Sequence, residues 1–214
     1  MLYFMEILPN FVVFEGGDGS GTTTQLTALE HTLSMNTDMP LPAIHKTFEP
    51  TDGPVGRLIR QGMRGEITLK NETIACLFAA DRYEHIYGPA GVEEQCKQGK
   101  LVVCDRYFFS SLVYQGITCG EDLPLVLNRG FPLPELVLFF DIDPETSQKR
   151  ISGRSQKEIY ETYEFQLKVR ERYKSVMQKY SGMTRAEVID ASLSKEEVSA
   201  QVWRVIGKMP IFRR

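Results

Sequence analysis

The sequence has no apolar run long enough to cross a lipid bilayer. Its longest uninterrupted apolar stretches are residues 11–14 and 136–140, whereas a membrane-spanning helix needs about 20 such residues. Residues 1–10 lack the basic start, the longer apolar core and the small-residue cleavage site of a secretory signal peptide. We therefore expect no membrane partner, and we interpret residues 1–10 as a short extension or an altered start.

Cysteine is also scarce. The 4 cysteines, Cys76, Cys96, Cys104 and Cys119, form no C-x-x-C pair. A chain of 214 residues can bury a substantial core without disulfide bonds. These features predict reduced thiols and a cytoplasmic location.

Basic residues are not in excess. The sequence has 25 Lys and Arg against 28 Asp and Glu, a net charge of −3, whereas nucleic-acid-binding proteins usually carry a basic excess on one face. Hydrophobic residues make up 42% and charged residues 25%, which is typical of globular proteins, and no internal repeat or linker is visible. We expect a single domain over residues 1–214 and no nucleic-acid partner.

Short apolar runs recur at residues 11–15, 43–48, 101–104, 136–141 and 187–189. Polar or amphipathic segments long enough for helices separate them, and the first begins at residue 23. Strands that alternate with helices predict βαβ units and a parallel sheet. The run at 136–140 is apolar on both faces, as a strand covered by helices on each side must be. We predict a three-layer α/β/α fold with a five-stranded parallel sheet.

Residues 157–180 are charged and amphipathic, with Tyr160, Tyr163, Leu167 and Tyr173 among Lys, Arg and Glu. The alternative is a fully solvated helix. Gly153 and other small or polar residues at 152–157 interrupt the helical pattern. This segment is a candidate mobile loop within a short lid at about residues 150–162.

A glycine-rich stretch follows the first apolar run. Residues 16–23 read G-G-D-G-S-G-T-T, which matches the phosphate-binding loop G-x-x-x-x-G-K-[ST] except for Thr22 at the lysine position. Backbone N–H groups at a helix N-terminus can hold phosphates there, and the alternative is a plain glycine turn. The predicted ATP-binding residues are Gly16, Gly17, Asp18, Gly19, Ser20, Gly21, Thr22, Thr23 and Thr24.

Several segments together resemble the thymidylate kinase family. Residues 14–25 are similar to that family's F-E-G-x-D-G-x-G-K-T-T-Q, and residues 47–60 to T-R-E-P-G-G-T-x-x-G-x-x-I-R. Residues 77–82 match L-F-A-A-D-R, and residues 105–116 match D-R-Y-x-x-S-S-x-A-Y-Q-G. The resemblance runs from about residue 11 to residue 180. It implies a fold of the P-loop NTPase type and an enzyme that phosphorylates dTMP to dTDP with ATP and Mg²⁺, in dTTP biosynthesis.

The acceptor nucleotide is expected on one helix face. Phe78 and Arg82 are four residues apart, so a ring can stack on a base while a guanidinium reaches its edge. The alternative is a core Phe beside a surface Arg. The resemblance implies that Phe78 stacks on thymine, that Arg82 hydrogen-bonds it, that Ser111 and Gln115 lie near the base, and that Tyr114 lies near the sugar's 2′ position.

Other residues are expected near the phosphates. Asp105 ends an apolar run at the carboxyl edge of the sheet, where ligands of such sheets gather. With Thr23, whose alternative role is an ordinary first-turn residue, it is a candidate Mg²⁺ ligand. The resemblance places Arg106 on the acceptor phosphate and Asp18 on the 3′-hydroxyl, and the alternative for residues 105–106 is a surface ion pair. By the same resemblance Arg60 contacts the acceptor phosphate, and the substrate site also includes Glu49 and Pro50.

Two positions depart from the family. Thr22 replaces the phosphate-loop lysine, and Ile159 stands where the family's [DE]-R-x-E has arginine. One cation 4 Å from a phosphate contributes on the order of 4 kcal/mol at a dielectric constant near 20, which is roughly a thousandfold in rate. Our hypothesis is that Arg154 or Lys157 of the lid partly substitutes. The predicted catalytic residues are therefore Asp18, Arg106, Arg154 and Lys157.

The sequence is compatible with three functions. The first is thymidylate kinase activity on dTMP and ATP. The second is a catalytically impaired nucleotide-binding protein on the same scaffold, which the two missing cations suggest. The third is a kinase for another nucleotide. By resemblance we also expect a homodimer formed through helices that include residues 73–87.

Overall fold

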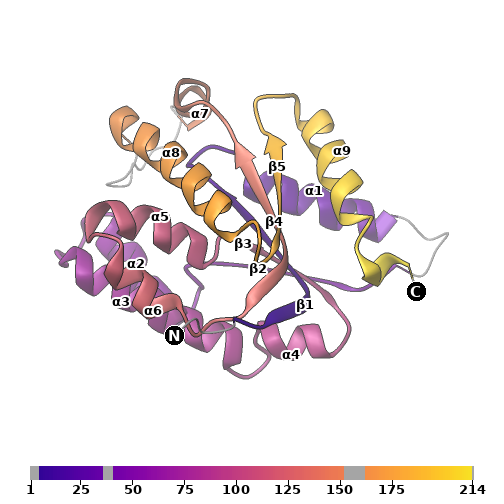
Figure 1. Cartoon of the computed structure of the whole chain (residues 1–214), viewed down its shortest axis with the longest axis horizontal. Coiled ribbons are helices and arrows are strands. Elements are labelled where there is room, and N and C mark those ends of the chain that lie inside the picture. The colour runs from indigo at the N-terminus through magenta and orange to yellow at the C-terminus, as the bar shows by residue number, and fades with distance from the viewer. Residues whose placement is uncertain (1–4, 36–40, 152–161, 214) are drawn as a thin grey trace.

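The computed structural model describes residues 5–35, 41–151 and 162–213 (Figure 1). The strands are β1 (Ile7–Gly16), β2 (Ile44–Phe48), β3 (Leu101–Asp105), β4 (Leu133–Asp141) and β5 (Arg185–Asp190). The helices are α1 (Thr22–Met35), α2 (Pro54–Met63), α3 (Asn71–Tyr87), α4 (Val92–Lys97), α5 (Phe108–Thr118), α6 (Asp122–Asn128), α7 (Pro144–Ile151), α8 (Tyr163–Tyr180), α9 (Lys195–Ile206) and the 3₁₀ turn η1 (Pro210–Phe212).

The five described strands form one parallel sheet in the order β2-β3-β1-β4-β5. The predicted five-stranded parallel sheet is therefore confirmed. From the central strand β1 the chain first forms β2 and β3 on one side of it and then β4 and β5 on the other side. Because β1 and β3 are adjacent and parallel, the loops that follow them lie side by side. Ligands of such sheets bind at the carboxyl ends of strands where this change of direction occurs.

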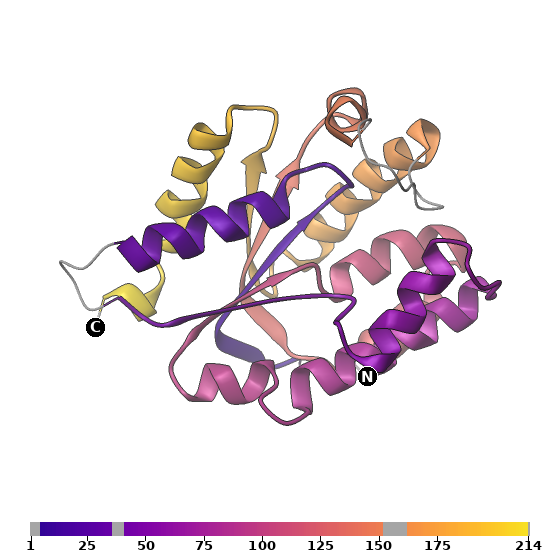
Figure 2. The same cartoon turned by 180° about the vertical axis from the view of Figure 1, so that it is seen from behind.

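Helices cover both faces of the sheet. Successive apolar side chains of each strand point to opposite faces, so each face has to be buried. Phe11 and Val13 of β1 belong to a core cluster that contains residues of α3, α4, α5 and α8. Val12 and Phe14 belong to a second cluster, with residues of α1 and α9. Figures 1 and 2 show the two sides, with α8 in front of the sheet in one view and α1 in the other. The expected three layers are present.

The start of the chain differs from our expectation. Residues 7–10, interpreted as part of an extension, are the first residues of β1, and Ile7 pairs with Leu133 of β4. The register shifts between Leu8 and Val12, and Asn10 has a positive φ of 64°. Its backbone N–H donates to Glu135 at 2.7 Å. This irregularity interrupts the apolar pattern on which the prediction depended.

Helix α8 is not a fully solvated helix. Val169, Tyr173, Val176 and Met177 are buried against the sheet, while Tyr163 and Leu167 are exposed. The alternative considered for this segment is therefore wrong for residues 163–180. In the part of the chain described here, no helix combines the length and apolar character that a membrane span requires.

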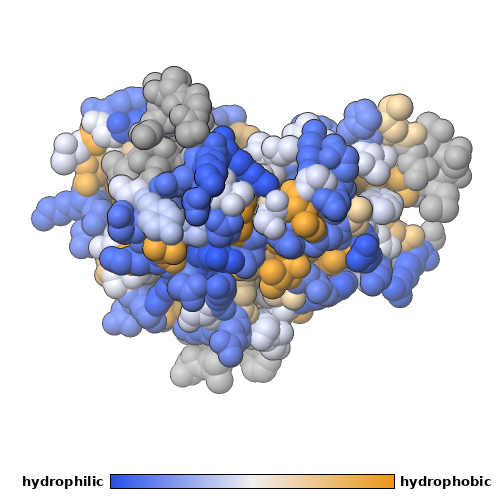
Figure 3. Space-filling view, turned by 90° about the horizontal axis from the view of Figure 1, so that it is seen from above, coloured by the Kyte–Doolittle hydropathy of each residue, from blue (hydrophilic) through white to orange (hydrophobic). Residues whose placement is uncertain are grey.

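The arrowheads of β4 and β5 point upward in Figure 1. Figure 3 views the molecule from that side, and its surface is mainly hydrophilic with small hydrophobic groups between the polar side chains. A polar ligand suits this edge of the sheet better than an apolar one does.

Candidate active site

A cavity of about 390 Å³ lies where the loops after β1, β2 and β3 meet helices α2, α3 and α5. It is lined by Gly17, Asp18, Gly19, Gly21, Thr22, Thr23, Thr24, Glu49, Pro50, Arg60, Met63, Arg64, Phe78, Arg82, Asp105, Arg106, Tyr107, Ser110, Ser111, Tyr114 and Gln115. Four arginines face three carboxylates in this set. This excess of positive charge suits a negatively charged ligand.

The glycine-rich loop joins β1 to α1 and needs its glycines for two physical reasons. Gly19 and Gly21 have positive φ angles of 79° and 89°, a conformation that side chains disfavour. A Cβ on Gly16 would lie 2.5 Å from Ser20 Oγ and 3.0 Å from the Phe140 carbonyl oxygen. Ser20 Oγ is itself buried and has no hydrogen-bond partner among the described residues.

The loop ends at the first turn of α1. Thr22, at the position of the missing lysine, begins the helix and is buried. Gln25 fixes the helix from its other side, because its amide donates to the Lys195 carbonyl at 3.0 Å and accepts from Ser199 at 2.7 Å. These hydrogen bonds hold α1 in place, so the free backbone N–H groups at its start have a fixed position beside the cavity.

The two predicted metal ligands lie together. Thr23 Oγ1 donates to Asp105 Oδ2 at 2.5 Å, although 82 residues separate them. Asp105 Oδ1 is buried and has no hydrogen-bond partner among the described residues. A hydroxyl and a carboxylate with an unused oxygen, beside a phosphate-binding loop, are the oxygen donors that Mg²⁺ prefers. The residues present therefore fit this ion.

Arg106 is the centre of a polar network on the other side of the loop. Its Nη2 donates to Asp18 Oδ1 at 2.7 Å, and its Nη1 donates to the Gly16 carbonyl at 2.9 Å. Its backbone has a positive φ of 70°. Gln166 of α8 donates to the second oxygen of Asp18 at 2.8 Å. Asp18 is thus held towards Arg106 and away from the loop's own phosphate-binding N–H groups.

Glu15 supports this network from below and was not predicted from the sequence. It is fully buried, and its Oε1 accepts from the backbone N–H groups of Tyr107 at 2.8 Å and Ser110 at 3.2 Å. Its Oε2 accepts from the Ser110 hydroxyl at 2.6 Å and the Tyr173 hydroxyl at 2.9 Å. Burial raises the pKa of Glu15 to about 7, against the lowering effect of these hydrogen bonds and of Arg106.

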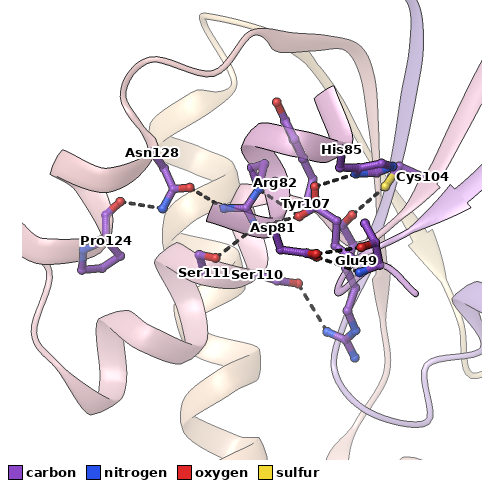
Figure 4. A network of polar contacts seen from close by, with 12 residues as sticks. Glu49, Asp81, Arg82, His85, Cys104, Tyr107, Ser110, Ser111, Pro124 and Asn128 are labelled. Carbon is purple, nitrogen blue, oxygen red and sulfur yellow. Dashed lines mark hydrogen bonds and ion pairs between the residues drawn. The ribbon is translucent and has the colours of Figure 1, made fainter. Parts of the chain in front are cut away.

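Phe78 and Arg82 both line the cavity from α3. The alternative of a core Phe beside a surface Arg is wrong, because Phe78 is half-buried whereas the Arg82 side chain is only 1% exposed. Arg82 makes a buried ion pair with Glu49, with Nη2 and Oε2 2.7 Å apart. It also donates to Ser111 at 3.2 Å and to Asn128 Oδ1 (Figure 4).

The carboxylate of Glu49 points towards Arg82. Its second oxygen lies 3.0 Å from His85 Nδ1. Glu49, His85 and Cys104 offer three potential metal ligands within 4.8 Å of one another. The carboxylate is already bound to Arg82, however, and burial raises the pKa of the Cys104 thiol well above its usual range, which disfavours a thiolate ligand. We interpret this cluster as support for Arg82.

Arg60 lies at the rim of the cavity. It donates to the carbonyl oxygen of Thr51 at 2.5 Å and to that of Pro50, and its guanidinium lies 5.7 Å from the centre of the Phe48 ring. Arg64, four residues later, lines the same cavity. Arg64 was not predicted from the sequence, although the four-residue spacing places it on the same helix face as Arg60.

A second cavity, of about 410 Å³, lies on the other side of the glycine-rich loop. Its lining joins Gly19, Ser20, Gly21 and Thr24 to Arg150 and to the start of α9. Arg150 is fixed there, because its Nη1 donates to the Ala191 carbonyl at 2.9 Å. The loop is thus open to a ligand from two sides.

Most of the residues predicted for the site lie together. Every predicted ATP-binding and substrate-binding residue lines the first cavity except Gly16 and Ser20, of which Ser20 lines the second and Gly16 accepts from Arg106. Arg154 and Lys157 lie outside the described residues, as does Ile159. The residues that sequence reasoning missed are Met63, Arg64, Tyr107 and Ser110 of the lining, and Glu15, Asn128, Gln166 and Tyr173 behind it.

Known proteins are similar to this chain in sequence. The sequence model of the family described as thymidylate kinase matches residues 14–202. A putative thymidylate kinase of Treponema pallidum is 41% identical over 211 residues, which are 98% of this chain and 99% of that protein. A probable thymidylate kinase of Pyrobaculum aerophilum is 35% identical over 206 residues, covering 95% of this chain and 99% of that protein.

A solved structure is similar in fold. The structure of thymidylate kinase from Candida albicans superposes with a TM-score of 0.74 and covers 92% of this chain and 91% of its own. At 24% identity, this likeness supports the arrangement of the sheet and helices and nothing finer. The family match and the two relatives carry the assignment. This chain belongs to the thymidylate kinase family.

Proposed function

We propose that this chain transfers a phosphoryl group from ATP to dTMP, giving ADP and dTDP. The observation that carries the proposal is a single cavity that contains both the phosphate-binding loop and the Phe78–Arg82 helix face. The loop would bind the donor phosphates, and the helix face would bind the acceptor base. Family membership supports the same reaction.

The reaction needs no strong general base, because the attacking oxygen of a nucleoside monophosphate is already anionic near neutral pH. The protein must instead hold two polyanions close together in the right orientation. Arg106 suits this task, since its guanidinium lies between Asp18 and the start of the loop. We propose that Arg106 binds the acceptor phosphate and that Asp18 accepts a hydrogen bond from the sugar's 3′-hydroxyl.

Mg²⁺ would be held by Thr23 and Asp105, directly or through water. The ion supplies charge neutralisation of the donor phosphates when it is bound. The unused buried oxygen of Asp105 supports this assignment. The donor nucleoside would occupy the second cavity, where Arg150 and the start of α9 face the loop.

The absence of the loop lysine is expected to slow phosphoryl transfer. Thr22 brings no charge to the loop, but Arg60, Arg64, Arg82 and Arg106 line the same cavity. The lining still has one more arginine than carboxylates, and this excess positive charge attracts phosphate groups even where the loop lysine is absent. We keep the hypothesis that Arg154 or Lys157 supplies a further positive charge. A purely nucleotide-binding protein is less favoured, because the acceptor side of the cavity keeps the residues that the family resemblance requires.

We also propose a homodimer formed through α3 and α6. Tyr83 and Tyr87 of α3 are 59% and 40% exposed, and Val126 of α6 is 54% exposed. Exposed apolar side chains that gather on one surface often mark a subunit interface. Sedimentation analysis would give a mass of two chains, and a Tyr83→Glu variant would shift it to one.

Two further expectations remain proposals. One is that residues 1–214 form a single domain with a short lid at about residues 150–162. The other is a cytoplasmic location, which the four free cysteines support.

The proposed reaction is tested by measuring ADP release from ATP and Mg²⁺ with each nucleoside monophosphate in turn. We expect the highest kcat/KM with dTMP, because Phe78 and Arg82 provide a stacking surface and a hydrogen-bond donor for its base. A higher kcat/KM with another nucleotide would support the alternative of a different kinase. Binding of dTMP without ADP release would support the nucleotide-binding protein.

A further inference from the structure

Asn128 is a buried polar residue that none of the motifs contains. It is the last residue of α6 and only 3% exposed. Its amide nitrogen donates to the Pro124 carbonyl at 2.8 Å, which fixes the orientation of the side chain. Its Oδ1 atom consequently faces Arg82 Nη1 and accepts a hydrogen bond from it (Figure 4).

The hydrogen-bond donors of Arg82 can be counted. A guanidinium has five N–H groups. Nε donates to Glu49 at 2.9 Å, Nη2 donates to Ser111 at 3.2 Å and directs its other hydrogen to the ion pair with Glu49, and Nη1 donates to Asn128. One Nη1 hydrogen is left without a partner among the described residues. Arg82 lines the cavity although its side chain is only 1% exposed, so a ligand that uses this hydrogen must lie in direct contact with the guanidinium.

The plane of the guanidinium is fixed as well. The Tyr107 and Phe131 ring centres lie 5.4 and 5.6 Å from Arg82 Cζ. Glu49 holds the Nε and Nη2 side of the group, whereas Asn128 is the contact made on Nη1 among the described residues. Without Asn128, Arg82 would keep its ion pair but lose the group that orients its free donor.

We propose that Asn128 is a positioning residue that sets base specificity by orienting towards the acceptor base the Nη1 hydrogen of Arg82 that has no partner among the described residues. A fixed donor favours a base with a carbonyl oxygen at the facing edge. Thymine presents such an acceptor where cytosine presents an amino group. A buried site built to make a hydrogen bond rejects a ligand that cannot complete it. This inference rests on the proposed function, since it assumes that the acceptor base lies against Phe78 and Arg82.

The test uses two variants and one control. Asn128→Leu keeps the approximate volume but removes both hydrogen bonds, and Asn128→Asp keeps an oxygen for Arg82. Asn71→Leu, at an exposed asparagine of α3 that donates to the Thr118 carbonyl at 3.4 Å, is the matched control. For each protein we would measure kcat/KM for dTMP and dCMP, and KM for ATP.

Asn128→Leu is expected to lower the dTMP-to-dCMP ratio of kcat/KM by about 10- to 100-fold, which is the range for a hydrogen bond to a charged group. KM for ATP should stay unchanged, because a merely structural defect would disturb both substrates. Asn128→Asp and the Asn71→Leu control should keep the wild-type ratio. An unchanged ratio in Asn128→Leu would overturn the inference. If that variant does not fold, loss of discrimination in Asn128→Asp would overturn it instead.

Failure of the proposed reaction gives a different result. A wild-type protein that does not phosphorylate dTMP contradicts the proposed function itself. In that case the dissociation constants of dTMP and dCMP, measured by calorimetry, replace kcat/KM in the same comparison. An Asn128→Leu ratio that equals the wild-type ratio would overturn the role of Asn128 there too.

Discussion

Replacing Glu15 with glutamine should change how the stability of the protein depends on pH. Glu15 is fully buried beneath the turn that carries Arg106, and it accepts hydrogen bonds from two backbone N–H groups and two hydroxyls. Glutamine has nearly the same shape and mimics the protonated carboxyl. Comparing the two proteins therefore isolates the ionisation of this one group.

The magnitude follows from its pKa. Burial raises the pKa of Glu15 from its usual value of 4.5 to about 7, against the lowering by Ser110, Arg106, Tyr173 and Tyr107. This difference corresponds to about 3 kcal/mol of folding free energy. The folded protein binds the proton more tightly than the unfolded chain does. The contribution is therefore fully present below pH 4.5 and is lost as the pH rises through 7.

The assay is denaturant unfolding of wild type and Glu15→Gln at several pH values between 4.5 and 8. Relative to the variant, the wild-type free energy of unfolding should fall by about 3 kcal/mol over this range. The slope should reach about 1.4 kcal/mol per pH unit between the two pKa values. A free-energy difference that stays constant with pH would refute the reasoning, and a difference that grows in favour of wild type would reverse it.

Two further predictions concern the metal ligands and the loop after β2. Asp105→Asn should raise the Mg²⁺ concentration needed for half-maximal activity by about 10- to 100-fold, and an unchanged titration at fixed ATP would exclude Asp105 as a ligand. Gly56→Ala should lower the free energy of unfolding by about 1–3 kcal/mol, because its Cβ would lie 1.9 Å from the Thr51 carbonyl oxygen. Gly130→Ala is the control, since a Cβ there meets nothing within 4 Å. Equal denaturation midpoints for the two variants would contradict this account.

The sheet was predictable because each of its strands is marked by an apolar run between polar segments. Residues 136–140 are apolar on both faces, and β4 indeed contributes Val137 and Phe139 to the core on one side of the sheet and Leu136, Leu138 and Phe140 to the core on the other. The first residues of β1 were missed, since Pro9 and the positive φ of Asn10 interrupt the pattern where the register shifts. A bulge of this kind depends on the partner strand, which local sequence does not reveal.

The cavity lining was predictable where it depends on short motifs at the carboxyl ends of strands. Thr23 and Asp105 are 82 residues apart but meet because β1 and β3 are adjacent and parallel. Asn128 and Gln166 were not predictable. They reach Arg82 and Asp18 through the packing of α6 and α8, across 46 and 148 residues of sequence, and no motif marks them.

The central claim is that this chain catalyses phosphoryl transfer to dTMP although Thr22 occupies the lysine position. The most direct measurement is dTDP formation from dTMP, ATP and Mg²⁺ by wild type and by Thr22→Lys, in parallel. We predict that wild type forms dTDP, and that the added lysine raises kcat by roughly tenfold to a thousandfold. Tight binding of dTMP by wild type with no dTDP formed, together with turnover by Thr22→Lys, would contradict the account and identify a nucleotide-binding protein on a kinase scaffold.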